Sequence, residues 1–152
     1  MKKFTSLLLC SLLLLSLFVP VSALDAAPAD SQTVSTQTID LGDGLTVTEE
    51  LVINDQARTA SRSATKKQTF SDNGTTIAEI AITGVFRYDG STVSVSSKLV
   101  SQKDTYDGWS FTQNSFTSSG GTITLAGKLT KPLRVSVSVN IKLTCDKNGN
   151  IS

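Results

Sequence analysis

The sequence predicts an all-β protein: an antiparallel β-sandwich of about seven strands, Ig-like or similar, that follows a cleaved signal peptide. Apolar and polar residues alternate over several windows, as they do in half-buried strands. After residue 23, no window has the i, i+3, i+4, i+7 apolar spacing of an amphipathic helix. Turn signals built on Gly, Asn and Asp separate the alternating windows at the spacing typical of a sandwich.

Residues 1–23 have the three parts of a secretory signal peptide. Lys2-Lys3 form a positive start, residues 7–20 form an apolar run, and Val21 and Ala23 place small residues before the cleavage bond. The apolar run is short for a bilayer span, so we expect cleavage after Ala23 and no transmembrane anchor in the processed chain. The protein is therefore predicted to be secreted, either extracellular or associated with the cell envelope.

The composition argues against several classes of mechanism. The 152 residues include 14 Lys and Arg, 13 Asp and Glu, two Cys and no His. Without His there is no imidazole base for a Ser or Cys nucleophile and no imidazole metal ligand. The formal charge of +1 gives no sign of a phosphate-neutralising surface, so nucleic acid is not an expected partner. We predict a non-enzymatic protein with no catalytic residues, no cofactor and no metal site.

The region after the leader is rich in hydroxyl side chains. It contains 17 Ser and 19 Thr against seven aromatic residues, a composition typical of a secreted β-domain with polar outer faces. Residues 24–40 are small and polar without a sustained apolar period, and we interpret them as a flexible N-terminal lead. The β-sandwich domain is expected over residues 41–152.

The strands are expected in order after a turn at residues 41–44. Their predicted ranges are 45–53, 58–70, 78–88, 93–99, 109–116, 122–129 and 135–145. The clearest is 135–145, where all six odd positions are apolar and every even position is polar. In 78–88, alternation places on one face Ala78, Ile80, Ile82, Phe86 and Tyr88. Asp89-Gly90 is typical of a tight hairpin turn into the next strand.

Two segments carry a resemblance to known proteins. They are the hairpin Gly84-Val85-Phe86-Arg87-Tyr88-Asp89-Gly90 and the terminus Leu143-Thr144-Cys145-Asp146-Lys147-Asn148-Gly149-Asn150-Ile151-Ser152, with the single Trp109 between them. Over roughly residues 45–152 the chain resembles a loose group of small, uncharacterised secreted proteins of Gram-positive bacteria. Those proteins share a G-x-F-x-Y-(N/D)-G hairpin and an L-T-C-x-x-N-G-x-hydrophobic-S terminus. The resemblance implies the fold and secretion, and it implies no activity.

The resemblance also bears on Cys145. Members of the group often carry a second Cys a few residues after the hairpin turn, whereas residues 91–96 of this chain contain none. Val95 stands at roughly that position. The resemblance therefore implies that the side chains of Val95 and Cys145 are in contact.

A basic cluster is the first candidate site. It consists of Arg58, Arg62, Lys66 and Lys67, and on a strand Arg58, Arg62 and Lys66 share one face. One interpretation is contact with an anionic wall polymer, a lipid headgroup or a sulfated glycan. The interpretation we favour is a solvated edge strand whose charges block pairing with other strands.

Aromatic residues form the second candidate site. Tyr106, Trp109 and Phe111 lie next to acidic residues, and exposed rings in such a loop can stack on a sugar. Trp109 and Phe111 share one strand face, however, which favours a role in the sandwich core. The speculative ligand contacts are thus Tyr106, Trp109, Arg58, Arg62 and Lys66.

The C-terminal segment is expected to be structural. Residues 146–150 depart from a calcium-binding loop, because the Gly falls at the fourth place and no bidentate acid follows, so we predict a turn. Cys145 has the apolar parity of its strand, which predicts a buried and unreactive thiol. The alternative for this Cys is a disulfide between chains.

We expect a binding or structural role at the cell envelope or outside the cell, with a cell-wall polymer, a glycan or a surface protein as partner. The alternative is a small secreted effector, such as a bacteriocin-like or inhibitory protein. Size and secretion favour that alternative, but the chain shows neither a cationic amphipathic segment nor a cysteine scaffold.

Overall fold

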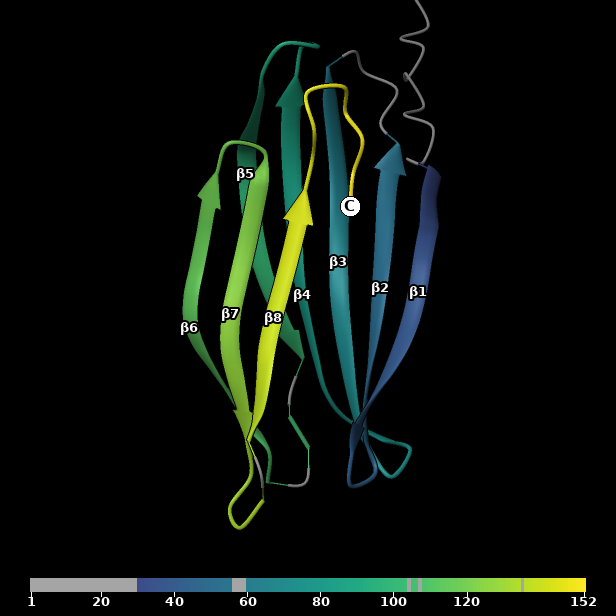
Figure 1. Ribbon diagram of the computed structural model, residues 1–152, viewed down its shortest axis with the longest axis vertical. Helices are drawn as coiled ribbons and strands as arrows, with labels where there is room; N and C mark the ends of the chain where they lie inside the picture. Colours follow the sequence, from purple (N-terminus) through teal and green to yellow (C-terminus); the bar gives the residue numbers. More distant parts are fainter. Residues whose placement is uncertain (1–29, 56–59, 104, 107, 135) are drawn as a thin grey trace, which may run out of the picture.

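The protein is an antiparallel β-sandwich built from two sheets. The computed structural model describes residues 30–55, 60–103, 105–106, 108–134 and 136–152. Its strands are β1 (Asp30–Gly42), β2 (Leu45–Asp55), β3 (Ser61–Asp72), β4 (Thr75–Tyr88), β5 (Val93–Lys103), β6 (Ser110–Ser119), β7 (Thr122–Thr130) and β8 (Val137–Thr144). They form a five-stranded sheet, β1-β2-β3-β4-β5, and a three-stranded sheet, β6-β7-β8, that packs on its β3–β5 part (Figure 1). The predicted all-β fold class is confirmed.

The core lies between the two sheets and is built from alternate residues of each strand. In β4 the predicted face is confirmed, because Ala78, Ile80, Ile82 and Phe86 are fully buried. The facing side chains of the smaller sheet are Ile123, Leu125, Leu129, Val139, Ile141 and Leu143. Gly84 shares the inner parity of β4, and a Cβ there would overlap Cδ1 of Ile123. The missing side chain of Gly84 therefore allows the two sheets to approach closely.

β1 is the main departure from the sequence prediction. Residues 30–40 belong to a strand that pairs with β2, so the flexible lead expected there is wrong from Asp30 onward. The sandwich accordingly has eight strands in place of about seven. β1 lacks apolar alternation because it contacts β2 alone and its inner face is not covered by β6–β8. Residues 1–29, including the predicted signal peptide and Cys10, lie outside the part that the structure describes.

Two hairpins of the larger sheet close with two-residue turns. Asp43-Gly44 and Asn73-Gly74 all have positive φ angles, between 49° and 79°. Such angles define the type I′ turn, whose twist matches that of the flanking strands. The amide of Asn73 donates to the carbonyl of Gly44 at 2.8 Å, so the two turns support each other.

The β4–β5 hairpin is present, but its connection is longer than expected. Residues 89–92 form a four-residue loop in place of a tight turn at Asp89-Gly90. The Asp89 carboxylate organises this loop by accepting hydrogen bonds from the amides of Ser91 and Thr92, at 2.8 Å and 2.6 Å. The amide of Asp89 also donates to the Thr92 carbonyl at 3.2 Å, so side-chain and backbone hydrogen bonds together close the loop.

The two lateral sides of the sandwich differ. On one side, Nζ of Lys98 in β5 donates to the Phe116 carbonyl of β6 at 3.1 Å and lies 4.6 Å from the centre of the Phe116 ring. On the other side, β1 and β2 extend beyond the three-stranded sheet (Figure 1). The sandwich is therefore closed along β5 and β6 and open along β1.

Candidate functional site

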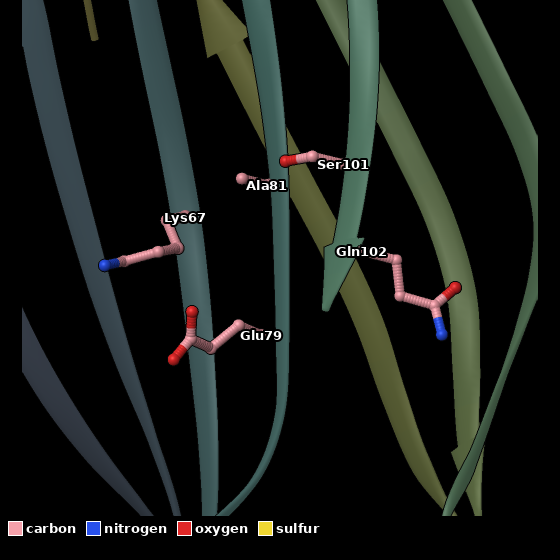
Figure 2. A pocket seen from close by; sticks show the side chains of 5 residues that line it. All are labelled: Lys67, Glu79, Ala81, Ser101 and Gln102. Carbon is pink, nitrogen blue, oxygen red and sulfur yellow. The ribbon is translucent and has the colours of Figure 1, made fainter. Parts of the chain in front are cut away.

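The outer face of the five-stranded sheet, turned away from the smaller sheet, carries the candidate site. Lys67 in β3 is paired with Glu50 in β2 and with Ala81 in β4, and Ala81 is paired with Ser101 in β5. Directly paired residues of antiparallel strands point to the same face, so these four side chains form one row. Because Ala81 carries only a methyl group, the sheet is hollowed above it. The depression has a volume of about 240 Å³ and is lined by Lys67, Glu79, Ala81, Ser101 and Gln102 (Figure 2).

Polar groups surround the methyl group of Ala81. Figure 2 shows the Ser101 hydroxyl directed toward Ala81 and the carboxylate of Glu79 further along β4, whereas the side chain of Gln102 points away from Ala81. Lys67 extends its Nζ to within 2.8 Å of the Glu50 carboxylate. The depression therefore presents an ammonium donor, a carboxylate acceptor and a hydroxyl that both donates and accepts.

The ion pair with Lys67 favours the ionised form of Glu50. The hydrogen bond from Lys67 is the largest cause that lowers the pKa of Glu50, and desolvation partly opposes it. The charge of Lys67 and a hydrogen bond from Thr33 lower this pKa further. A pair this exposed contributes only about 0–1 kcal/mol to stability, so its main effect is to position Lys67. Because the ammonium of Lys67 is paired with the Glu50 carboxylate, these two groups add no net positive charge that would attract a polyanion.

The predicted basic cluster does not form one surface. Arg58 lies outside the described residues. Arg62 and Lys66 share one face of β3 as expected, but it is the inner face, and Lys67 points to the outer one. Nη1 of Arg62 donates to the Gly149 carbonyl at 2.9 Å, a structural contact with the C-terminal segment. The edge-strand interpretation is also wrong, because β3 pairs with both β2 and β4.

The aromatic residues are separated by burial. Trp109 is only 3% exposed and belongs to the core, so its ring offers no face to a ligand and we withdraw it as a candidate contact. Phe111 is half-buried and packs against Gly127. Tyr106 is 51% exposed, and its amide is anchored to the carbonyl of Ile77 at 3.0 Å. The stacking platform of Tyr106 and Trp109 is therefore not present.

The C-terminal segment after β8 forms a closed loop on the β4–β5 hairpin. The Asp146 carboxylate accepts hydrogen bonds from the amides of Asn148 and Asn150, at 2.8 Å and 2.9 Å, and from Nδ2 of Asn150 at 2.7 Å. The amide of Gly90 donates to the Lys147 carbonyl at 2.9 Å, which joins the loop to the hairpin. The predicted turn is confirmed, and the two segments that carry the family resemblance meet here.

Acid is expected to loosen this loop. Hydrogen bonds from Asn150 are the first cause that lowers the pKa of Asp146, and bonds from Asn148 and Gly149 add to it. A lowered folded-state pKa adds stability above the unfolded value, and this stability is lost as pH falls through the folded value. We expect the free energy of unfolding to decline below about pH 4, and to decline less in Asp146→Asn. Urea unfolding at a series of pH values measures both. An identical acid dependence in the two proteins would contradict this role of Asp146.

Cys145 is buried, as predicted from its parity. Its Sγ lies 3.4 Å from the Asp146 carbonyl, and its backbone pairs with Ile151. Burial is the largest cause that raises the pKa of this thiol, and the charge of Asp146 raises it further. The described residues contain no disulfide. Contact between Val95 and Cys145 stays a prediction.

Cys145 should react slowly in the native protein. In the variant Cys10→Ser, which leaves Cys145 as the single thiol, a disulfide reagent should label the folded protein far more slowly than the urea-unfolded protein. Burial keeps the thiol both protonated and out of reach. Equal rates for the folded and unfolded protein, or a covalent dimer that reduction dissolves, would contradict the assignment.

The sequence interpretation missed the residues of the depression. Ala81 was the available signal, because it is an alanine on the polar parity of β4, between Glu79 and Thr83. The residues that pair with Ala81 could not be predicted, because the sequence of one strand does not determine its register with another strand. Within the described ranges, no group of three or more acidic or Cys residues is placed to hold a metal ion, and no helix is long and apolar enough to cross a membrane.

Comparisons with protein families, with curated proteins and with solved structures gave no match to this chain.

Proposed function

We propose that the protein is a non-enzymatic binding or structural module that acts at the cell envelope or outside the cell. Its ligand in this proposal is an uncharged, polyhydroxylated polymer such as a cell-wall glycan, held on the outer face of the five-stranded sheet. The observation that carries the proposal is the depression over Ala81, lined by Lys67, Glu79, Ser101 and Gln102. The signal-peptide pattern of residues 1–23 supports the location.

The chemistry of the depression fits hydroxyl groups. A sugar hydroxyl donates one hydrogen bond and accepts others, and the lining supplies both kinds of partner. The pairing of the Lys67 ammonium with the Glu50 carboxylate favours an uncharged ligand over an anionic one. This differs from the anionic polymer considered for the basic cluster, because Arg62 and Lys66 lie on the other face.

The surrounding surface also suits an extended polymer. Hydroxyl side chains continue on both sides of the depression, as in the pairs Thr38–Thr48 and Thr65–Thr83, whose Oγ1 atoms lie 3.0 Å and 2.8 Å apart. A hydroxyl-bearing sheet face gives a polymer hydrogen-bonding partners across several strands. Contacts at many weak points then add up along one chain.

Filling the depression tests the proposal. We expect the purified protein to be retained on isolated Gram-positive cell walls, and Ala81→Gln to weaken retention by about tenfold, the equivalent of one or two lost hydrogen bonds. The matched control is Ser97→Gln, which adds a similar side chain to the outer face of β5 four residues from Ser101. Retention should change little with salt, since uncharged partners are not screened.

Three outcomes would contradict the proposal: no retention of the wild-type protein on cell walls or insoluble glycans, equal retention of the two variants, or release by moderate salt. Circular dichroism of both variants shows whether each retains the fold. A loss of retention in a folded Ala81→Gln protein, with Ser97→Gln unaffected, assigns binding to this face.

A further inference from the structure

β1 is an edge strand without the protection that the other edges have. β5 and β6 are joined through Lys98, and the β8 carbonyl of Asn140 accepts a hydrogen bond from Nε2 of Gln68 at 3.1 Å. β1 contacts β2 alone, and its sequence contains no Lys, Arg or Pro. Those residues are the usual means by which an edge strand avoids pairing with another chain.

Apolar side chains are exposed along the same strand. Val34, Ile39 and Leu41 are 51%, 39% and 43% exposed. Ile39 pairs with Val47 on the inner face, beyond the cover of β6–β8, while Val34 and Leu41 lie at the two irregularities of the β1–β2 ladder. The ladder is regular between them, from residue 35 to residue 40. A free backbone edge beside exposed apolar groups is a site for strand addition.

We infer that a second copy of this chain pairs with β1, antiparallel about a two-fold axis, to join the two larger sheets into one. Residues 31–39 carry no charge, so the strand meets its own copy without like charges in opposition. Opposed residues must point to the same face, which requires each pair of residue numbers to have an even sum. A centre on any single residue meets this condition, and we place it at Gln37 because that residue lies near the middle of the regular stretch.

The centre at Gln37 makes a specific set of neighbours. Gln37 faces Gln37 of the second copy, Thr36 faces Thr38, and Ser35 faces Ile39. Asp40 falls opposite the irregularity at Val34, outside the regular pairing. Pairing along one strand buries a small area, so the dimer is a weak one that depends on protein concentration.

Cross-linking tests the register. In Gln37→Cys, mild oxidation should produce a covalent dimer, because the two introduced thiols face each other across the axis. The matched control is Ser97→Cys, on the exposed outer face of β5 at the other edge of the sheet, which should stay monomeric. The wild-type chain supplies the background from its own two cysteines. Equal cross-linking of the two variants would overturn the pairing.

Sedimentation tests the association without oxidation. The wild-type protein should show a monomer–dimer equilibrium that salt leaves unchanged, because the pairing strands are uncharged. Ile39→Lys should weaken the dimer by about tenfold, since the two-fold axis places each substitution in the interface twice. Leu99→Lys, which replaces an apolar side chain that is 64% exposed on β5, should leave the dimer unchanged. A monomer at all concentrations, or a dimer sensitive to Leu99→Lys and not to Ile39→Lys, would overturn the inference.

Discussion

Replacing Phe86 with Ala should lower the free energy of unfolding by about 3–5 kcal/mol, the largest effect expected for a single side chain here. Phe86 is fully buried on the inner face of β4 and belongs to the cluster that joins the two sheets. Its ring lies beside Gly84, where Ile123 of the opposite sheet approaches the backbone. The substitution removes the apolar contact area and leaves a cavity that closely packed neighbours cannot fill. Urea denaturation followed by tryptophan fluorescence measures the change.

Arg87→Ala is the matched control, because Arg87 is the exposed neighbour on the opposite face of β4. It should change the free energy of unfolding by less than about 0.5 kcal/mol, as surface substitutions do. The two substitutions therefore compare the faces of one strand. A larger loss for Arg87→Ala than for Phe86→Ala would mean that the faces of β4 are reversed.

Gly149→Ala is expected to have the second-largest effect, a decrease in the free energy of unfolding of about 2–4 kcal/mol. Gly149 has a φ of +86°, which strains any residue with a Cβ. A Cβ there would also overlap the ring of Tyr88. Displacing the ring or the loop disturbs the contacts of Arg62 with the Gly149 carbonyl and of Gly90 with Lys147. Thermal unfolding of the two proteins shows the difference.

Gly74→Ala separates the two causes. Gly74 has a similar φ of +79°, but a Cβ there meets no atom within 4 Å. Gly74→Ala should therefore lower the free energy of unfolding by about 1–2 kcal/mol, through backbone strain alone. In a Tyr88→Ala background, the excess cost of Gly149→Ala over Gly74→Ala should disappear, since the ring that causes it is gone. If the excess persists in that background, overlap with the ring of Tyr88 is not its cause.

Strands with one face in the core between the two sheets, such as β4 and β8, could be predicted from the sequence. β1, which contacts only β2, could not. β8 alternates strictly, and β4 alternates over part of its length, because one face of each strand is sealed in the core. β1 contacts only β2, so burial imposes no pattern on its Ser, Thr and Gln residues. The basic cluster misled for a related reason. Alternation shows which residues share a face of β3, but not that this face is the inner one.

The candidate site was harder to predict from the sequence than the fold. The depression over Ala81 depends on three strands whose residues are far apart in sequence and are brought together by register. Burial of Trp109 followed from its parity with Phe111, which the sequence does show. The contact between the β4–β5 hairpin and the C-terminal loop lies beyond strand periodicity, because it depends on a glycine that accommodates the ring of Tyr88.

Amide chemical-shift mapping by NMR tests whether the outer face of the five-stranded sheet is the binding surface. Soluble fragments of isolated Gram-positive cell wall are the probe, added to the isotopically labelled protein. We expect the amide signals that move to belong to the outer-face residues around the depression and their neighbours on β3, β4 and β5: Lys67, Glu79, Ala81, Ser101 and Gln102. Shifts confined to β6–β8, to the C-terminal loop or to β1, or no shifts at saturating fragment concentration, would contradict it.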